Sequence, residues 1–194
     1  VYRQHLVPVE GQTDVLTMGL PYICPYNVNS IMNPILVMCL GLGYFFNLYR
    51  GKPLVREGGV LIMGHPTPWE FHPVHHPSYI DFFEQVLADT TDPAEIEKRW
   101  EKQFAEDEWY IHLYRTSYAY HGVHPFYMWY WGAHALQHLG RVIVVGGDVA
   151  AVRRMGFQPA STLQDALEMA TDVVGPQPTI THVKNPPIFM ADVS

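Results

Sequence analysis

Two short runs of aliphatic residues constrain the fold of this chain more than any other feature. Val60-Leu61-Ile62-Met63 follows a glycine pair, and Val142-Ile143-Val144-Val145 precedes another. Neither run alternates with polar residues, so a strand at either place would be covered on both faces. Strands of this kind occur in parallel sheets that are packed between helices. The two runs therefore predict an α/β fold.

Helical segments separate these runs from two further predicted strands, at residues 14–18 and 179–183. The resulting order is strand, helix, strand, helices, strand, two helices, strand. This order predicts an open, mainly parallel sheet of about four strands with helices on both faces, a Rossmann-like three-layer sandwich. No stretch of residues 1–194 has the composition of a linker, so we expect a single domain.

Capping residues predict several helix boundaries. Asn27 or Asn29 is expected to cap a helix that contains Pro34 and runs to about residue 50. Ser78 and Asp81 are expected to form a capping box. Other predicted starts are Asp92-Pro93 with Glu95 reaching back, Asp148, and Ser161-Thr162. Residues 108–120 are predicted to be helical, residues 125–139 to form a buried helix, and Pro186-Pro187 to end the last strand.

The charge balance excludes some partners. The chain has a formal charge of −7 and only 12 lysines and arginines, without the basic stripe that nucleic acid requires. The apolar stretch 31–46 is shorter than the ~20 residues of a spanning helix, so we expect no membrane partner. Cys24 and Cys39 are too few for a disulfide framework, and residues 1–5 carry no apolar leader. A cytoplasmic location is therefore predicted.

Three predicted loops would meet at the carboxyl end of the sheet, where ligands bind in folds of this kind. They follow the first three strands, at residues 19–29, 64–77 and 146–148. We predict that they line a site for a small-molecule substrate. Its candidate binding residues are Tyr22, Tyr26, Asn27, His65, Glu70 and His72, with Trp69, His75, His76 and Asp148 in the same loops.

The histidines permit a metal site as an alternative. Imidazole and carboxylate groups suit zinc or nickel, and His72, His75 and His76 are the candidate ligands, with His65 and Glu70 nearby in sequence. Their spacing matches no closed metal motif, so a proline-stiffened loop with solvated histidines is favoured and no metal is expected. His134 and His138 could pair on one helix face, but a packed core with hydrogen-bonded histidines is favoured there too.

Aromatic residues crowd residues 109–131. Ten large rings in so short a stretch can fill a core or wall a ligand site. They can also form an exposed apolar surface for a second domain or for an oligomer.

The order of elements and several local sequences resemble the C-terminal domain of the lactate racemase-like family. The resemblance covers nearly the whole chain. It rests on Thr13–Pro21, on Gly58–Ile62, on Asp92–Glu97 with Phe104, and above all on Met155-Gly156-Phe157-Gln158-Pro159-Ala160-Ser161-Thr162-Leu163 with Ala166-Leu167. It implies a two-domain isomerase with its active site in the cleft between the domains, of which this chain supplies only the C-terminal half.

The resemblance also implies a cofactor and a substrate class. In this family a nickel-pincer nucleotide is tethered to the N-terminal domain, so none is expected on this domain alone. The implied activity is racemisation or epimerisation of a 2-hydroxy acid or a related hydroxy compound. The family's substrate-contacting lysine corresponds to Tyr26, within Cys24-Pro25-Tyr26-Asn27, and a tyrosine cannot give a carboxylate a charge-assisted bond. A non-catalytic, diverged domain and a metal-binding hydrolase using residues 65–76 are the alternatives.

Overall fold

The computed structural model describes residues 2–28, 30–184 and 190–194, and it is an open α/β structure with two parallel sheets. The larger sheet has the order β6 (Gln158–Ala160), β5 (Arg141–Val145), β4 (Val55–Gly64), β2 (Thr13–Gly19) and β7 (Ile180–Val183). The smaller sheet has the order β1 (Leu6–Val9), β8 (Met190–Val193) and β3 (Tyr49–Gly51). All the pairings are parallel.

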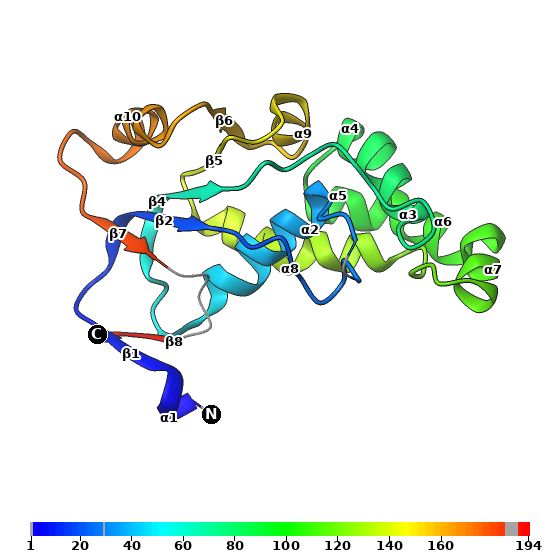
Figure 1. Ribbon diagram of the computed structural model, residues 1–194, viewed down its shortest axis with the longest axis horizontal. Helices are drawn as coiled ribbons and strands as arrows, with labels where there is room; N and C mark the ends of the chain where they lie inside the picture. Colours follow the sequence, from blue (N-terminus) through cyan, green and yellow to red (C-terminus); the bar gives the residue numbers. More distant parts are fainter. Residues whose placement is uncertain (1, 29, 185–189) are drawn as a thin grey trace.

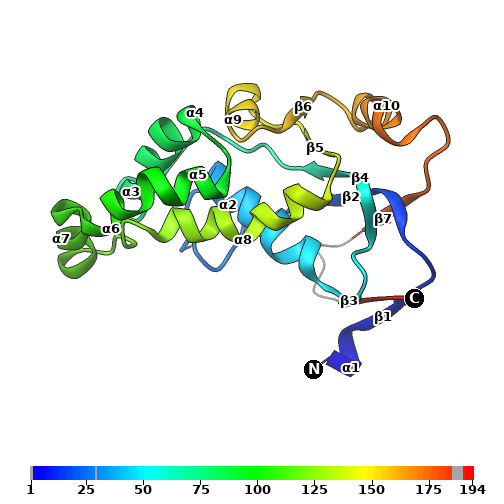
Figure 2. The same cartoon turned by 180° about the vertical axis from the view of Figure 1, so that it is seen from behind.

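The three-layer prediction is confirmed for the larger sheet (Figures 1 and 2). One face carries Val60 and Ile62 and packs against α10 (Leu163–Val174). The other face carries Leu61 and Met63 and packs in the main core with α2 (Pro34–Met38) and α8 (His124–His138). Strand residues therefore alternate between two apolar layers, which explains why the run is apolar throughout.

The four predicted strands are adjacent in the sheet, as β5, β4, β2 and β7. The sequence pattern missed β6 at one edge and the whole smaller sheet. The missed strands are each three or four residues long, too short for an alternation pattern to be recognised. Pro186 and Pro187 lie outside the described residues.

The helical segments follow their caps in most places. Those after β4 are α3 (Pro77–Asp81) running into α4 (Leu87–Asp89), α5 (Pro93–Ile96) running into α6 (Lys102–Glu106), and α7 (Glu108–Thr116). Asp92 caps α5, Asp148 caps α9 (Val149–Arg154), and Thr162 forms a capping box with Asp165 at α10. A short helix, α1 (Tyr2–His5), precedes β1. None of the helices in the described residues combines the length and the apolarity that a membrane crossing requires.

Two predicted starts were wrong. The helix after β2 is capped by Asn33, whose side chain accepts from Leu36 N at 3.1 Å, with Pro34 in its first turn. Asn27 closes the preceding loop, and Asn29 lies outside the described residues. This helical segment ends at Asn47, because residues 49–51 form β3.

The capping box at Ser78 and Asp81 was also wrong. The helix begins one residue earlier, at Pro77, and Ser78 Oγ donates to the carbonyl of His121 at 3.3 Å. Asp81 is used elsewhere, since its carboxylate accepts from Gln85 and from the Tyr110 hydroxyl.

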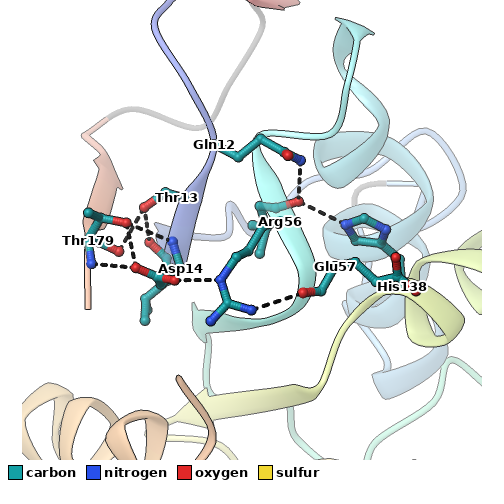
Figure 3. Close-up of polar contacts among 9 residues, drawn as sticks. Gln12, Thr13, Asp14, Arg56, Glu57, His138 and Thr179 are labelled. Atoms are coloured by element: carbon teal, nitrogen blue, oxygen red, sulfur yellow. Dashed lines mark hydrogen bonds and ion pairs between the residues drawn. The ribbon is translucent and has the colours of Figure 1, made fainter. Parts of the chain in front are cut away.

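A polar network fastens the edge strand β7 at the amino end of the larger sheet (Figure 3). Asp14 Oδ2 accepts from Thr179 N at 2.8 Å and from Thr179 Oγ1 at 2.7 Å. Asp14 Oδ1 accepts from Arg56 Nε at 2.5 Å. These bonds hold the pKa of Asp14 at about 2, with Thr179 the largest cause. The network lies at the amino end of the sheet, opposite the predicted ligand-binding edge, so we assign it to stability.

Candidate functional site

The loops that follow β2, β4 and β5 lie side by side at the carboxyl end of the sheet. Leu20 N donates to the carbonyl of Gly64 at 3.0 Å, and His65 N donates to the carbonyl of Val145 at 3.3 Å. Asp148 N donates to the carbonyl of Pro66 at 2.8 Å. We call residues 20–28, 30–33, 65–76 and 146–148 the carboxyl rim. The predicted convergence of these loops is confirmed.

His65 opens the second loop and is held in one orientation. The amide of Thr67 donates to His65 Nδ1 at 2.8 Å, so Nδ1 carries the lone pair and the proton lies on Nε2. The ring is 3% exposed, and among the described residues no group accepts from Nε2. Tyr22 is the nearest aromatic neighbour, with its ring centroid 5.0 Å away at 44°. His65 is therefore a buried donor without an acceptor.

Thr67 adopts a backbone conformation that disfavours its own side chain. Its φ is 45°, in the left-handed region, although threonine is β-branched and this residue is fully buried. Its hydroxyl donates to the carbonyl of His65 at 3.1 Å. Strained residues of this kind cluster at functional sites. The strained residue here orients His65 at the carboxyl end of the sheet, where the ligand site is predicted.

A second group joins the rim to the helices beside it, and we call it the histidine–tyrosine cluster: Tyr26, His76, Tyr79, Tyr120 and His124. His76 Nε2 bonds to the carbonyl of Tyr26 at 2.9 Å, and its ring stacks on Tyr120 with centroids 5.4 Å apart. The Tyr79 hydroxyl lies 2.5 Å from His124 Nδ1. Tyr120 stacks on His124 at 4.3 Å.

Hydroxyl groups extend the cluster toward the helical stretch that follows α2, at residues 39–47. The Tyr26 hydroxyl lies 2.9 Å from the hydroxyl of Tyr44, whose ring packs on Trp131 at 4.6 Å. The cluster is therefore a connected set of aromatic rings with hydrogen-bonding edges. One buried nitrogen of the cluster, His76 Nδ1, has no hydrogen-bond partner among the described residues.

Burial keeps these groups uncharged. Desolvation lowers the pKa of His65, of His76 and of His124 to about 4 in each case. Desolvation raises the pKa of Tyr79 and of Tyr120. At neutral pH the imidazoles and phenols are thus neutral donors and acceptors. The arrangement can therefore bind and orient hydroxyl or carbonyl oxygens with uncharged groups.

The other predicted binding residues have mixed positions. Asn27 is buried and structural, since its side chain bonds to the backbone of Tyr22, Cys24 and Ser30. Glu70 is exposed at the outside of its loop, and His72 is half-buried. Asp148 is exposed and accepts from Ala151 N as the cap of α9. Binding roles for Tyr22, Tyr26, His65, Glu70 and His72 stay predictions.

The rim histidines do not assemble into a metal site. His72 stacks on His75 with centroids 4.1 Å apart, and His72 Nδ1 accepts from the amides of Val74 and His75. His76 Nε2 is bonded to the carbonyl of Tyr26. Across the described ranges, no three histidine, cysteine, aspartate or glutamate side chains are placed to hold one ion. The metal-binding alternative therefore lacks a ligand set.

His134 and His138 do not pair on a metal either. His134 Nε2 lies 2.7 Å from Asn47 Oδ1, and His138 Nε2 lies 2.8 Å from the carbonyl of Val55. The hydrogen bonds are as predicted, but His134 is exposed and not part of a packed core.

The crowded aromatic stretch divides between core and surface. Phe126 and Trp129 are fully buried, and Tyr110 is nearly so. The exposed rings are Trp109, Tyr114, Tyr118, Tyr127 and Trp131. Core filling thus accounts for part of the stretch, and the predicted interface or oligomer contact stays a prediction for the rest.

Two members of the cluster, Tyr79 and His124, were not among the predicted candidates, and their stretches indicated only helix formation and packing. Tyr120 belongs to the crowded aromatic stretch, for which a ligand wall was one of the predicted roles. The one sequence signal was His124 next to Pro125, a helix start that places a histidine on the first turn. Their approach to the rim depends on how α3 and α8 pack.

No protein-family model matches the chain, and a comparison with curated proteins finds no match. Among solved structures, the chain is similar to the lactate racemase apoprotein from Thermoanaerobacterium thermosaccharolyticum, with a TM-score of 0.54 and 15% sequence identity. The similarity covers 94% of this chain and 36% of that one. At this identity it shows a common fold. The chain therefore spans about a third of the length of the racemase.

Proposed function

We propose that this chain is one domain of a lactate racemase-like isomerase and lines a cleft that a second domain completes. The reaction would be racemisation or epimerisation at a carbon that carries a hydroxyl group. The observation that carries the proposal is the group of neutral histidines and tyrosines at the carboxyl rim, on a fold similar to that of a lactate racemase. The rim is the edge at which open parallel sheets bind their ligands.

In this proposal the chain binds and orients the substrate. Its neutral imidazoles and phenols offer donors and acceptors for hydroxyl oxygens, and the surrounding aromatic rings exclude water. His76 is positioned by its bond to the Tyr26 carbonyl and by its stacking on Tyr120. Tyr26, at the position of the family's lysine, bonds to Tyr44 and supplies no positive charge.

The family resemblance implies a nickel-pincer nucleotide, which supplies hydride-accepting chemistry when bound. The residues of this chain do not fit its attachment. The rim contains no lysine, and the described residues bring no three metal-ligating side chains together. We therefore assign no part of this group to the chain and route no step through it.

The test is an isomerisation assay on the natural polypeptide that contains this chain. Single enantiomers of lactate and of longer 2-hydroxy acids, and single epimers of neutral hydroxy compounds, are incubated and resolved by chiral chromatography. We expect one class to be interconverted, and His76→Ala to lower the rate at least ~10-fold because the cluster loses its central ring. His112→Ala, at an exposed position on α7, is the matched control. A folded wild-type protein that interconverts none of these compounds would refute the proposal.

A further inference from the structure

The carboxyl rim contains a hydrogen-bond donor that nothing in the described structure uses. His65 Nε2 is buried without an acceptor, while the Thr67 amide fixes Nδ1 as the lone-pair side of the ring. The two ring nitrogens point in divergent directions, so Nε2–H faces away from the Thr67 amide. Buried donors are nearly always paired in native proteins, and an exception calls for an unseen partner.

The backbone at this point is built to hold that donor. A fully buried threonine in the left-handed region is disfavoured, yet it donates both its amide and its hydroxyl to His65. The amide bond holds the imidazole ring, and the hydroxyl bond to the His65 carbonyl holds the turn that places the amide. A costly conformation that orients one side chain at the ligand-binding edge indicates preorganisation for a ligand.

The charge of the rim decides which ligands suit it. None of its loops contains a lysine or an arginine, and its charged residues are the carboxylates Glu70 and Asp148. The guanidinium of Arg154 lies 5.2 Å from the centroid of the Trp69 ring, and it donates to the carbonyls of Phe83 and Glu84. A carboxylate brought to this edge would lose hydration without gaining a charged partner.

An aromatic ring, that of Tyr22, lies beside the His65 donor. Tyr22 is 67% exposed and makes no side-chain hydrogen bond among those described. Its ring can move aside or pack on the C–H face of a ligand while its hydroxyl meets a ligand oxygen. Donor, hydroxyl and ring together suit a compound with several hydroxyl groups.

We propose that the rim binds a neutral polyhydroxy compound, with one oxygen of the ligand accepting from His65 Nε2–H and with Tyr22 as the aromatic wall. This inference rests on the proposed function for the location of the site. It narrows the substrate class from hydroxy acids and related compounds to uncharged ones.

The experiment compares xylitol with xylonate, which share a carbon skeleton and differ in one terminal carboxylate. Each is titrated into the natural polypeptide that contains this chain, with binding followed by calorimetry and by the imidazole NMR signals of ¹⁵N-labelled histidine. We expect xylitol to bind at least ~10-fold more tightly than xylonate and to shift the Nε2–H signal of His65. Equal or tighter binding of xylonate, no binding of either compound, or an unmoved His65 signal would each overturn the inference.

A variant isolates the donor. In His65→Asn the side-chain oxygen can still accept from Thr67 N, but nothing remains at the Nε2 position. We expect xylitol affinity to fall ~10-fold, and His112→Asn, remote on α7, to leave it unchanged. Unaltered affinity in a folded His65→Asn protein would overturn the assignment. If that variant does not fold, the His65 signal of the wild-type protein decides.

The two proposals can fail separately. Preferred binding of xylonate would reject the neutral-ligand inference and leave an isomerase acting on hydroxy acids. Xylitol binding at His65, without isomerisation of any compound by the natural polypeptide, would reject the proposed function and retain the ligand site.

Discussion

The hydroxyl of Tyr79 and Nδ1 of His124 lie 2.5 Å apart, in a bond that joins α3 to the first turn of α8. Tyr79 is fully buried, and burial keeps its phenol protonated by raising its pKa. This bond fixes the orientation of the two helices and with it the position of the histidine–tyrosine cluster.

Replacing this phenol tests the bond. Tyr79→Phe keeps the ring and leaves His124 Nδ1 without its partner, so we expect a loss of about 1–2 kcal/mol in the free energy of unfolding, measured with urea. Tyr118→Phe is the control, because Tyr118 is 83% exposed and should change stability by less than about 0.5 kcal/mol. Equal losses in the two variants would show that the bond adds nothing.

The sheet was predictable because its strands are covered on both faces. Residues 60–63 and 142–145 are buried by α10 on one side and by the main core on the other, which leaves no polar position along them. Helix caps such as Asp92 and Asp148 were also predictable, because a cap depends only on one side chain and the amides that follow it.

The histidine–tyrosine cluster could not be predicted from the sequence, because it depends on packing between residues far apart in the chain. His76 and Tyr120 are 44 positions apart in the sequence, and their stacking depends on the path of the chain through α3 to α7. The pairing of β8 with β1 likewise joins the two ends of the chain. No local pattern encodes such contacts. Sequence reasoning placed the loops at the right edge but could not say which residues would meet there.

Three buried histidines predict a distinct response to acid. The pKa of His65, His76 and His124 is about 4 in the fold, against about 6.5 for a free imidazole. Between these values the unfolded chain binds protons that the folded chain does not, so stability falls as the pH is lowered from about 6.5 to about 4. Well above pH 6.5 the three histidines are neutral in both states and contribute no pH dependence.

Urea unfolding at intervals from pH 7.5 to pH 4.5 measures this effect. His76→Gln removes one titrating group. The slope of the free energy of unfolding against pH in this range should therefore fall by at most the contribution of one bound proton. His112→Gln, exposed on α7, should leave the slope of the wild type unchanged. A flat stability profile between pH 6.5 and pH 4.5 would contradict the prediction.

The Asp14 network predicts a separate effect at the opposite edge of the sheet. Asp14→Asn removes the charge that accepts from Arg56 and weakens the bonds to Thr179 (Figure 3). Because these groups are partly exposed, we expect a loss of about 1 kcal/mol, with faster hydrogen exchange in β7 than elsewhere. Glu106→Gln breaks a pair with Lys102 that is exposed on both sides, and should cost less than about 0.5 kcal/mol.

The pH dependence distinguishes this network from the histidines. The pKa of Asp14 is lowered from 3.8 to about 2, so its contribution is present above pH 3.8 and is lost as the pH falls toward 2. Asp14→Asn should therefore flatten the stability profile below pH 4 and leave the histidine range unchanged. A change confined to pH 4–6.5 would contradict this assignment.

Gly122 gives the most direct test of how the cluster is held. It is buried midway between Tyr120 and His124, and a Cβ added there would lie 2.2 Å from the carbonyl oxygen of Phe104 and 3.0 Å from the Tyr110 ring. The Phe104 contact is with backbone, so α6 would have to move. We expect Gly122→Ala to lower the free energy of unfolding by about 2–3 kcal/mol in urea, and to shift the imidazole NMR signals of His76 and His124.

Gly19→Ala is the matched control, since its Cβ would meet nothing within 4 Å, and it should change stability by less than about 0.5 kcal/mol. If Gly122→Ala were as stable as Gly19→Ala, the segment that carries His124 would not be held by close packing against α6.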